Sequence, residues 1–250
     1  MKSEKDFLIG SWINTASPIV AEIMSNCDMD FLVVDLEHSV ADYNLSQQIF
    51  QAIKAGNPNC VPMVRLPGND YSVTKKYLDL GAMGVIAPLI CTARQAKTLV
   101  DSVKYPPLGN RGVGYGRSHG YGFDFDKYME IANDDTFICV QIEHIDALEN
   151  LDEIFSIEGI DAMIIGPYDL SASMGITAQF ESPKFINAIE LIKEKAKEHN
   201  ILPGIHVVQP NTDEAMKRIK EGYKFLAYSL DITVLGTYYR KGIKTIRENI

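Results

Sequence analysis

Cysteine is scarce in this sequence, and the spacing gives no cysteine an obvious partner. The four residues, Cys27, Cys60, Cys91 and Cys139, lie far apart along the chain and form no C-x-x-C pair. Small disulfide frameworks and structural zinc sites depend on closely spaced cysteines, so we predict neither. Cys60 and Cys139 fall at or inside apolar runs, where we expect buried free thiols.

The sequence also lacks long apolar runs and an excess of positive charge. Its start has no apolar segment typical of a secretion signal, and no stretch approaches the roughly 20 apolar residues of a membrane-spanning helix. The 24 basic and 33 acidic residues give a formal net charge of −9, without the basic stripe that nucleic-acid phosphates require. We therefore expect a cytoplasmic protein with neither a membrane nor a nucleic-acid partner.

A third absence concerns dinucleotide binding, because no G-x-G-x-x-G fingerprint follows the first apolar run. What the chain has instead is a regular alternation of strand-like runs and helical patterns from end to end. We predict strands over Phe7–Trp12, Phe31–Asp35, Val61–Leu66, Gly84–Leu89, Phe137–Ile142, Ala162–Gly166, Leu202–Val208 and Phe225–Ser229. We predict helices over Pro18–Ser25, Leu45–Ala55, Ser72–Leu80, Thr92–Val103, Ala147–Phe155, Pro183–Glu198, Thr212–Glu221 and Ile232–Ile246.

Eight strands that are each followed by a helix favour a closed parallel barrel over an open doubly wound sheet. The 250 residues suit such a barrel, which typically needs about that length. No Pro/Gly/Ser-rich linker divides the chain. We predict an α/β fold of the (β/α)8 TIM-barrel type, as one domain spanning residues 1–250.

The glycine-rich segment Tyr105–Tyr128 shows neither a strand nor a helix pattern. Loops this long are uncommon inside compact domains and are usually functional. We expect this segment to lie near the mouth of the barrel.

Three polar motifs follow predicted strands directly: Asp35–His38, Gln141–Glu143 and Gly166–Ser171. In a (β/α)8 barrel the C-terminal strand ends meet at one mouth, where active sites lie. The motifs therefore predict an enzyme with its site at that mouth.

Two carboxylates, Glu143 and Asp169, close strands that would be neighbours in such a barrel. They could share a divalent cation, whose other ligands would be water and substrate oxygens, or they could share a proton. Alternatively, each acid only caps the helix that follows, an interpretation that suits Asp169 better than Glu143. The spacing leaves these interpretations open.

His38 is a candidate general base, because histidine titrates near neutral pH. Asp35 is its candidate partner, since a nearby carboxylate would raise its basicity. The alternative is a hydrogen-bonded histidine in the barrel wall. The two positions differ by an odd number, so a direct pair requires the strand to end before His38.

Arg65 stands in an apolar run and cannot remain unpaired in a core. We expect it to reach the mouth and to meet an anion, either a substrate carboxylate or a developing enolate. A structural salt bridge to Asp35 or Glu37 is the alternative, and both roles can coexist.

The turn Gly166–Leu170 leads sharply from a strand into a helix, and free backbone N–H groups at such a start bind anions. We expect a substrate carboxylate there. The loops after the seventh and eighth strands lack the glycines of the usual barrel phosphate site, so phosphate is disfavoured.

In combination, these motifs resemble those of the metal-dependent (class II) pyruvate aldolases. The similar family is the 4-hydroxy-2-oxoheptanedioate and 2-keto-3-deoxy-sugar-acid aldolase type, in the phosphoenolpyruvate/pyruvate barrel superfamily. The resemblance runs from about Gly10 to Gly236. It is carried by DLEH (35–38), MVRLPGND (63–70), YPPLGNRGVG (105–114), VQIE (140–143) and GPYDLSASMG (166–175).

The resemblance implies a divalent metal, Mg²⁺, Mn²⁺ or Co²⁺, bound by Glu143 and Asp169. It implies that His38 is the base, acting through a metal-bound water, and that Arg65 stabilises the pyruvate enolate. It also offers Asp79, at the end of the third helix, as the residue that makes His38 more basic, in competition with Asp35.

Substrate contacts implied by the resemblance come from Gln141, Gly166, and the backbone amides of Tyr168 and Asp169. The family commonly has a small residue where this chain has Tyr168, and the stretch YGRSHGYG after Gly114 does not match it closely. Because of these two departures, the sequence does not identify the aldehyde.

The reaction implied by the resemblance is reversible aldol cleavage of a 4-hydroxy-2-oxo acid to pyruvate and an aldehyde. Two related lyases, an oxaloacetate decarboxylase and a CoA-ester lyase, would use the same enolate chemistry, and a non-catalytic ligand-binding barrel is a further alternative. A Schiff-base mechanism is disfavoured because Lys54, Lys75 and Lys76 lie on predicted helices. By the same resemblance we expect a homo-oligomer, a hexamer, with Ile232–Tyr239 in an interface.

Overall fold

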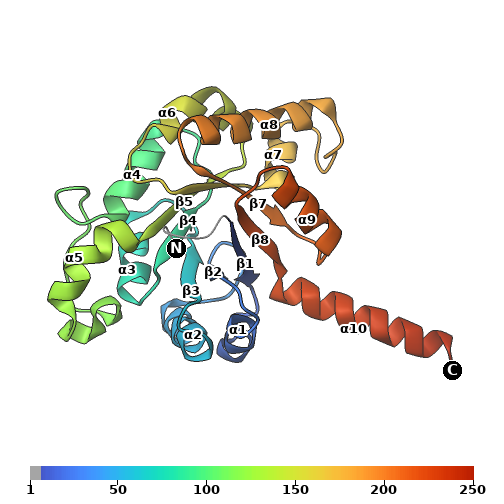
Figure 1. The fold of residues 1–250 in the computed structure, drawn as a ribbon, viewed down its shortest axis with the longest axis horizontal. Helices are drawn as coiled ribbons and strands as arrows, with labels where there is room; N and C mark the ends of the chain where they lie inside the picture. Colours follow the sequence, from blue (N-terminus) through green and yellow to red (C-terminus); the bar gives the residue numbers. More distant parts are fainter. Residues whose placement is uncertain (1–6) are drawn as a thin grey trace.

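Eight parallel strands pair in chain order and close into a barrel in the computed structural model, which describes residues 7–250 (Figure 1). The strands are β1 Leu8–Ile13, β2 Phe31–Asp35, β3 Val61–Arg65, β4 Gly84–Ala87, β5 Phe137–Ile142, β6 Ala162–Ile165, β7 Leu202–Val207 and β8 Phe225–Leu230. β1 pairs with both β2 and β8, which completes the ring. The (β/α)8 barrel predicted from the sequence is therefore confirmed.

Helices follow the strands around the outside of the barrel. They are α1 Pro18–Ser25, α2 Tyr43–Gly56, α3 Tyr71–Asp79, α4 Ala93–Val103, α5 Phe125–Asp135, α6 Leu151–Phe155, α7 Pro167–Ser173, α8 Pro183–Glu198, α9 Thr212–Lys220 and α10 Asp231–Glu248, with 3₁₀ turns η1 Arg117–Gly122 and η2 Ile145–Asn150. The sequence does not predict α5 and α7. α7 has only seven residues, and α5 buries Ala132 alone, so neither carries a clear apolar stripe.

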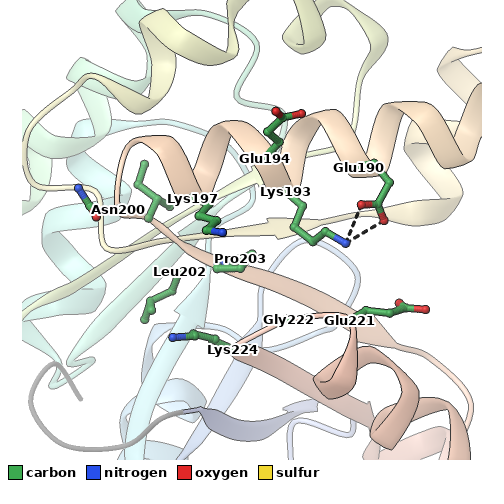
Figure 2. Close-up of a pocket in the computed structure, with 11 residues that line it drawn as sticks. Glu190, Lys193, Glu194, Lys197, Asn200, Leu202, Pro203, Glu221, Gly222 and Lys224 are labelled. Atoms are coloured by element: carbon green, nitrogen blue, oxygen red, sulfur yellow. Dashed lines mark hydrogen bonds and ion pairs between the residues drawn. The ribbon is translucent and has the colours of Figure 1, made fainter.

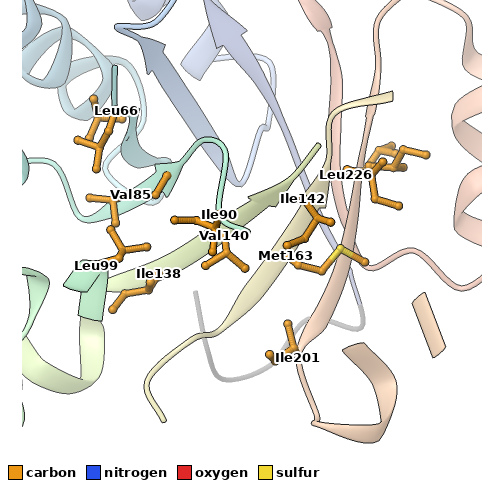
Figure 3. Close-up of a cluster of buried hydrophobic side chains, with 14 of the residues drawn as sticks. Leu66, Val85, Ile90, Leu99, Ile138, Val140, Ile142, Met163, Ile201 and Leu226 are labelled. Carbon is orange, nitrogen blue, oxygen red and sulfur yellow. The ribbon is translucent and has the colours of Figure 1, made fainter. Parts of the chain in front are cut away.

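Alternation along the strands separates two apolar layers. One layer lies between the strands and the surrounding helices, and part of it is drawn in Figure 3. The other fills the barrel, where the rings of Phe31 and Phe137 meet Phe225 at centroid distances of 4.5 and 5.4 Å. Gly10 is required beside them, because a Cβ there would come within 2.3 Å of the Phe31 carbonyl oxygen.

The segment Tyr105–Tyr128 runs along the outside of α3. Its Gly112 N–H donates to the Tyr71 hydroxyl at the start of α3, at 2.9 Å, whereas Gly116 packs on the carbonyl of Asp79 at its end. A connection from a helix to the next strand reaches the N-terminal strand ends. The prediction that this segment lies near the mouth is therefore wrong for its middle, where η1 forms.

The predicted state of the cysteines is confirmed, because Cys60 and Cys139 are buried free thiols. Among residues 7–250, no helix combines the length and the apolar character needed to cross a bilayer.

The last helix leaves the barrel. α10 starts at the end of β8 and projects away from the other helices, with the C-terminus at its far end (Figure 1). Every residue from 234 to 250 is exposed.

Candidate active site

Asp35 and Arg65 face each other inside the mouth of the barrel. They are register partners at the ends of β2 and β3, and the guanidinium donates twice to the carboxylate, at 2.8 Å to Oδ1 and 2.7 Å to Oδ2. Asn14 adds a third hydrogen bond, at 2.6 Å to Oδ2. Burial raises the pKa of Asp35, but Arg65 and Asn14 outweigh it and the pKa is lowered. The fully buried Asp35 is thus held ionised.

Arg65 is fixed on several sides. Its Cζ lies 4.5 Å from the centroid of the Trp12 ring, and its Nη1 lies 3.4 Å from Oε2 of Glu37. Burial lowers the pKa of Arg65, but the carboxylates of Asp35, Glu37 and Glu143 outweigh it and the pKa is raised. The alternative predicted from the sequence, a structural salt bridge from Arg65 to Asp35 or Glu37, is confirmed for both acids. The guanidinium still reaches the mouth, as a positive charge held by these contacts.

Glu143 follows β5 and is only 5% exposed. Its Oε1 accepts a hydrogen bond from the backbone N–H of Leu89 at 2.7 Å, and its Oε2 accepts a short one from the Gln141 amide. A Cβ on Gly166 would come within 2.6 Å of Oε2 of Glu143. Glycine at position 166 therefore leaves the space that this carboxylate occupies.

Three carboxylates, Glu37, Glu143 and Asp169, share the mouth. Burial raises the pKa of Glu143, and the charges of Glu37 and Asp169 raise it further, against hydrogen bonds from Gln141 and Leu89. Oε2 of Glu37 is buried and accepts no hydrogen bond from the residues that the structure describes. An acidic cluster in which this oxygen has ion contacts but no hydrogen bond has the donor chemistry that a hard divalent cation prefers.

Among residues 7–250, no group of three or more His, Cys, Asp or Glu side chains is arranged to hold a metal ion. A bound magnesium ion usually takes only one or two protein carboxylates, while water and substrate oxygens complete its octahedron.

His38 lies in the turn after β2, and its side chain is 66% exposed. The strand ends at Asp35, as the odd spacing requires. However, Asp35 Oδ1 accepts hydrogen bonds from the backbone N–H groups of Glu37 and His38, at 3.1 and 3.4 Å, and the imidazole contacts Glu37 at 4.0 Å instead. The structure therefore brings the two residues together through the main chain.

Asp79 does not meet His38 within one chain. It closes α3, at the end of the barrel opposite the mouth, and Oδ1 accepts a hydrogen bond from Nη2 of Arg111 at 2.8 Å. Arg111 is 1% exposed, so this ion pair anchors the start of the long α4–β5 connection.

Two residues of the mouth, Asn14 and Trp12, were missed in the sequence. Asn14 bonds to Asp35, and Trp12 packs between Arg65 and His206, whose ring centroid is 5.4 Å away. The Trp12 indole N–H is buried and has no acceptor among the described residues. A signal for Trp12 existed, because it is the single tryptophan and lies at the end of the first strand.

Because of the buried His206, we expect the folded protein to lose stability in acid. Burial lowers its pKa to about 4, against a hydrogen bond to the Ser229 carbonyl. The unfolded chain binds this proton below about pH 6.5, so the stabilisation is complete above that pH and is lost towards pH 4. Between pH 7 and 5 the loss should be up to roughly 2 kcal/mol. In His206→Gln this part of the loss should be absent. The free energy of unfolding, measured in urea at pH 7 and at pH 5, checks this.

Gln209→Asn, an exposed change after β7 that removes no titratable group, is the control and should keep the wild-type pH dependence. If His206→Gln lost as much stability on acidification as the wild type, the buried neutral imidazole would not be the cause.

The chain is similar to known proteins along most of its length. The family model described as HpcH/HpaI aldolase/citrate lyase matches residues 8–236. The chain belongs to this family. A hydroxypyruvate/pyruvate aldolase from Roseobacter denitrificans is 36% identical over 93% of this chain and 90% of that protein. A 2-keto-3-deoxy-L-rhamnonate aldolase from Salmonella gallinarum is 36% identical over 91% of this chain and 84% of that protein.

A solved structure of an HpcH/HpaI aldolase/citrate lyase family protein from Burkholderia cenocepacia has the same fold. It superposes with a TM-score of 0.92 at 28% identity, covering 98% of this chain and 96% of that one. Membership of the HpcH/HpaI family confirms the predicted family and enzyme class, a carbon–carbon lyase of the aldolase type.

Proposed function

We propose that this HpcH/HpaI family member catalyses reversible aldol cleavage of a 4-hydroxy-2-oxo acid to pyruvate and an aldehyde. The observation that carries the proposal is the opposition of two charges at the mouth. Arg65 is fixed by Asp35 on one side, and the buried Glu143 faces it with Asp169 on the other. A 2-oxo acid has an anionic end and an oxygen that becomes an enolate, and both need such positive charge.

Glu143 and Asp169 are the carboxylates that would hold a divalent cation, Mg²⁺, Mn²⁺ or Co²⁺. When bound, the cation supplies Lewis-acid chemistry that polarises a 2-oxo acid. The chain orients Glu143 in advance, because Gln141 and the Leu89 N–H fix its two oxygens.

Arg65 would stabilise the negative charge that develops when the C3–C4 bond of the substrate breaks. Because Asp35, Glu37 and Trp12 already hold the guanidinium, it needs no reorganisation during the reaction. Preorganised charge of this kind usually contributes more to enzymatic rate enhancement than any other effect.

His38 would remove the proton of the C4 hydroxyl, directly or through water. Its exposed imidazole stands on the turn above Asp35, with room to meet a substrate at the mouth. The backbone N–H groups of Tyr168 and Asp169, together with the Gln141 amide, would bind the substrate carboxylate. Tyr168 packs edge-on against Phe180 at 5.1 Å and limits the space left for the aldehyde.

A panel of aldehydes, incubated with pyruvate, Mn²⁺ and the purified protein, tests the proposal by product mass. New 4-hydroxy-2-oxo acids that depend on the enzyme support it. Release of CO₂ from oxaloacetate without any aldol product would favour a decarboxylase instead. Pyruvate binding without aldol products or exchange of its C3 protons would indicate a non-catalytic barrel.

We also propose a homo-oligomer in which α10 of one copy covers the barrel of another. Its exposed apolar residues recur at helical spacing, Ile232, Leu235, Tyr239, Ile243 and Ile246. Such a stripe on a helix that leaves its own barrel needs a partner surface. The hexamer expected from the resemblance remains a prediction.

The neighbouring helix α1 exposes Ile19 at 71% and Ile23 at 61%, and α9 exposes Met216 at 53%. α1 and α9 lie on either side of α10 (Figure 1), so the α10 of a second copy would cover exposed apolar side chains there. Leu235→Glu with Tyr239→Glu should therefore lower the molar mass seen by light scattering after size exclusion.

Lys241→Glu is the control, because it changes charge away from the apolar stripe of the same helix. It should keep the wild-type mass. A wild-type protein that elutes as a monomer would contradict the assembly.

A further inference from the structure

A second site is suggested by a cavity on the outside of the barrel, far from the mouth. The cavity has a volume of about 440 Å³ and lies between the end of α2, the α3–β4 turn, η1 and the end of α5. In a (β/α)8 barrel these places belong to the N-terminal strand ends. The catalytic residues proposed above take no part in it.

Two cations reach this cavity without an anionic partner. Lys54 and Arg117 are half-buried, and neither forms an ion pair with an acid in the described part of the chain. The Lys54 ammonium donates to the Pro58 carbonyl at 2.7 Å. Burial lowers the pKa of Lys54, and the charge of Arg117 lowers it further, against the Cys60 thiol. Two like charges in one cavity favour the binding of an anion there.

The backbone makes room for the guanidinium. Gly81 has a φ of +109°, and a Cβ there would come within 2.1 Å of Nη1 of Arg117. The next residue, Ser118, lines the same cavity, and its hydroxyl oxygen is buried without a hydrogen-bond partner among residues 7–250. The Ser118 hydroxyl, without a partner, and two cations that lack an anionic partner could all donate hydrogen bonds to a bound anion.

The acid in the lining, Asp135, can balance at most one of these two charges. It closes α5, is exposed, and forms no ion pair with Lys54 or Arg117. The other lining side chains include Met83 and Ile131, which are 38% and 43% exposed. The cavity thus combines a positive end with apolar walls.

A larger cavity of about 680 Å³, near the end of α8, lacks this imbalance. Figure 2 shows its lysines among glutamates, and Lys193 forms an ion pair with Glu190 at 2.8 Å. Its charged lining residues are Lys193, Lys197, Lys224, Glu190, Glu194 and Glu221. Equal numbers of both signs give it no preference for an anion.

We propose that the 440 Å³ cavity binds the phosphate group of a small phosphorylated molecule. Lys54 and Arg117 would neutralise the dianion, and the Ser118 hydroxyl would donate a hydrogen bond to it. The volume lies in the range of small-molecule sites and exceeds what a phosphate group fills. Met83 and Ile131 would cover the organic part.

Titration of the metal-free, full-length protein with inorganic phosphate and with AMP, followed by ³¹P NMR, tests this site. The wild type should bind both, and Lys54→Gln with Arg117→Gln should weaken both by at least about tenfold, the cost of charge-assisted hydrogen bonds. Lys220→Gln is the control for charge loss at the surface. Arg65→Ala controls for phosphate at the mouth, and both controls should bind as the wild type does.

No binding by the wild type, or an equal loss in either control, would overturn the proposal. Ile131→Trp provides a second variant, because it leaves both cations in place and fills the cavity. It should weaken AMP at least about tenfold relative to inorganic phosphate. Wild-type affinity for AMP in this variant would contradict the placement of the organic part. Circular dichroism verifies the fold of each variant.

Discussion

Replacing Arg65 with alanine should lower kcat/KM for aldol cleavage by at least about 10³-fold, since one oxyanion-stabilising donor alone contributes about 10²–10³. Arg65 contributes a full charge that Asp35 and Trp12 hold in place. Exchange of the C3 protons of pyruvate should fall with cleavage, because both reactions pass through the enolate. Steady-state kinetics and proton exchange in D₂O, followed by NMR, measure the two effects.

Arg65→Lys is the matched variant, because it keeps the charge and loses the bidentate geometry. Its activity should lie between those of the wild type and Arg65→Ala. Near-normal proton exchange in Arg65→Ala would show that another group stabilises the enolate.

Arg65→Ala should also lose stability, because Asp35 remains fully buried without its cation. Breaking a buried pair costs about 3–5 kcal/mol. With Arg65 absent, burial raises the pKa of Asp35, so the variant should regain stability relative to the wild type as the pH falls from 7 to 5. Denaturant unfolding at both pH values separates this structural effect from the catalytic one.

Removing the divalent metal with a chelator should abolish measurable cleavage, and added Mg²⁺, Mn²⁺ or Co²⁺ should restore it. Without a cation, Glu143 and Asp169 repel each other and would repel a substrate carboxylate. Burial raises the pKa of Glu143 most, and the charge of Asp169 adds to this increase. Residual metal, measured by mass spectrometry, and activity are compared before and after each addition.

Glu143→Gln keeps the shape of the side chain and removes its charge, so it should greatly weaken Mn²⁺ binding in a calorimetric titration. Glu153→Gln, an exposed position on α6, is the control and should bind Mn²⁺ normally. Full activity in a thoroughly stripped protein would falsify the metal-dependent mechanism.

Much of the fold is readable from local patterns. The predicted ranges of β2 and β5, Phe31–Asp35 and Phe137–Ile142, agree with the structure at both ends. Each is buried throughout and apolar except for one polar residue, Asp35 or Gln141. α5, over Phe125–Asp135, is not readable in this way. It buries a single residue and depends on contacts with η1 that are not evident from its own composition.

Partner choice at the mouth is where the sequence leaves alternatives. From the sequence, Asp35 could pair with His38 or with Arg65. The register between β2 and β3 places it opposite Arg65. Asp79 likewise follows from the resemblance as a partner of His38, yet α3 runs away from the mouth and ends beside Arg111. Register and helix direction bring together residues that are distant in sequence, so spacing alone cannot assign such pairs.

The sequence by itself determined that this chain forms a barrel and that acids, a histidine and an arginine meet at its mouth. Both conclusions depend on period and composition, which act over a few neighbouring residues. Only the tertiary structure decided that Arg65 is held by Asp35, that α10 leaves the barrel, and that Lys54 and Arg117 share a cavity. Those outcomes arise from packing between elements far apart in the chain, where burial and charge depend on the whole fold.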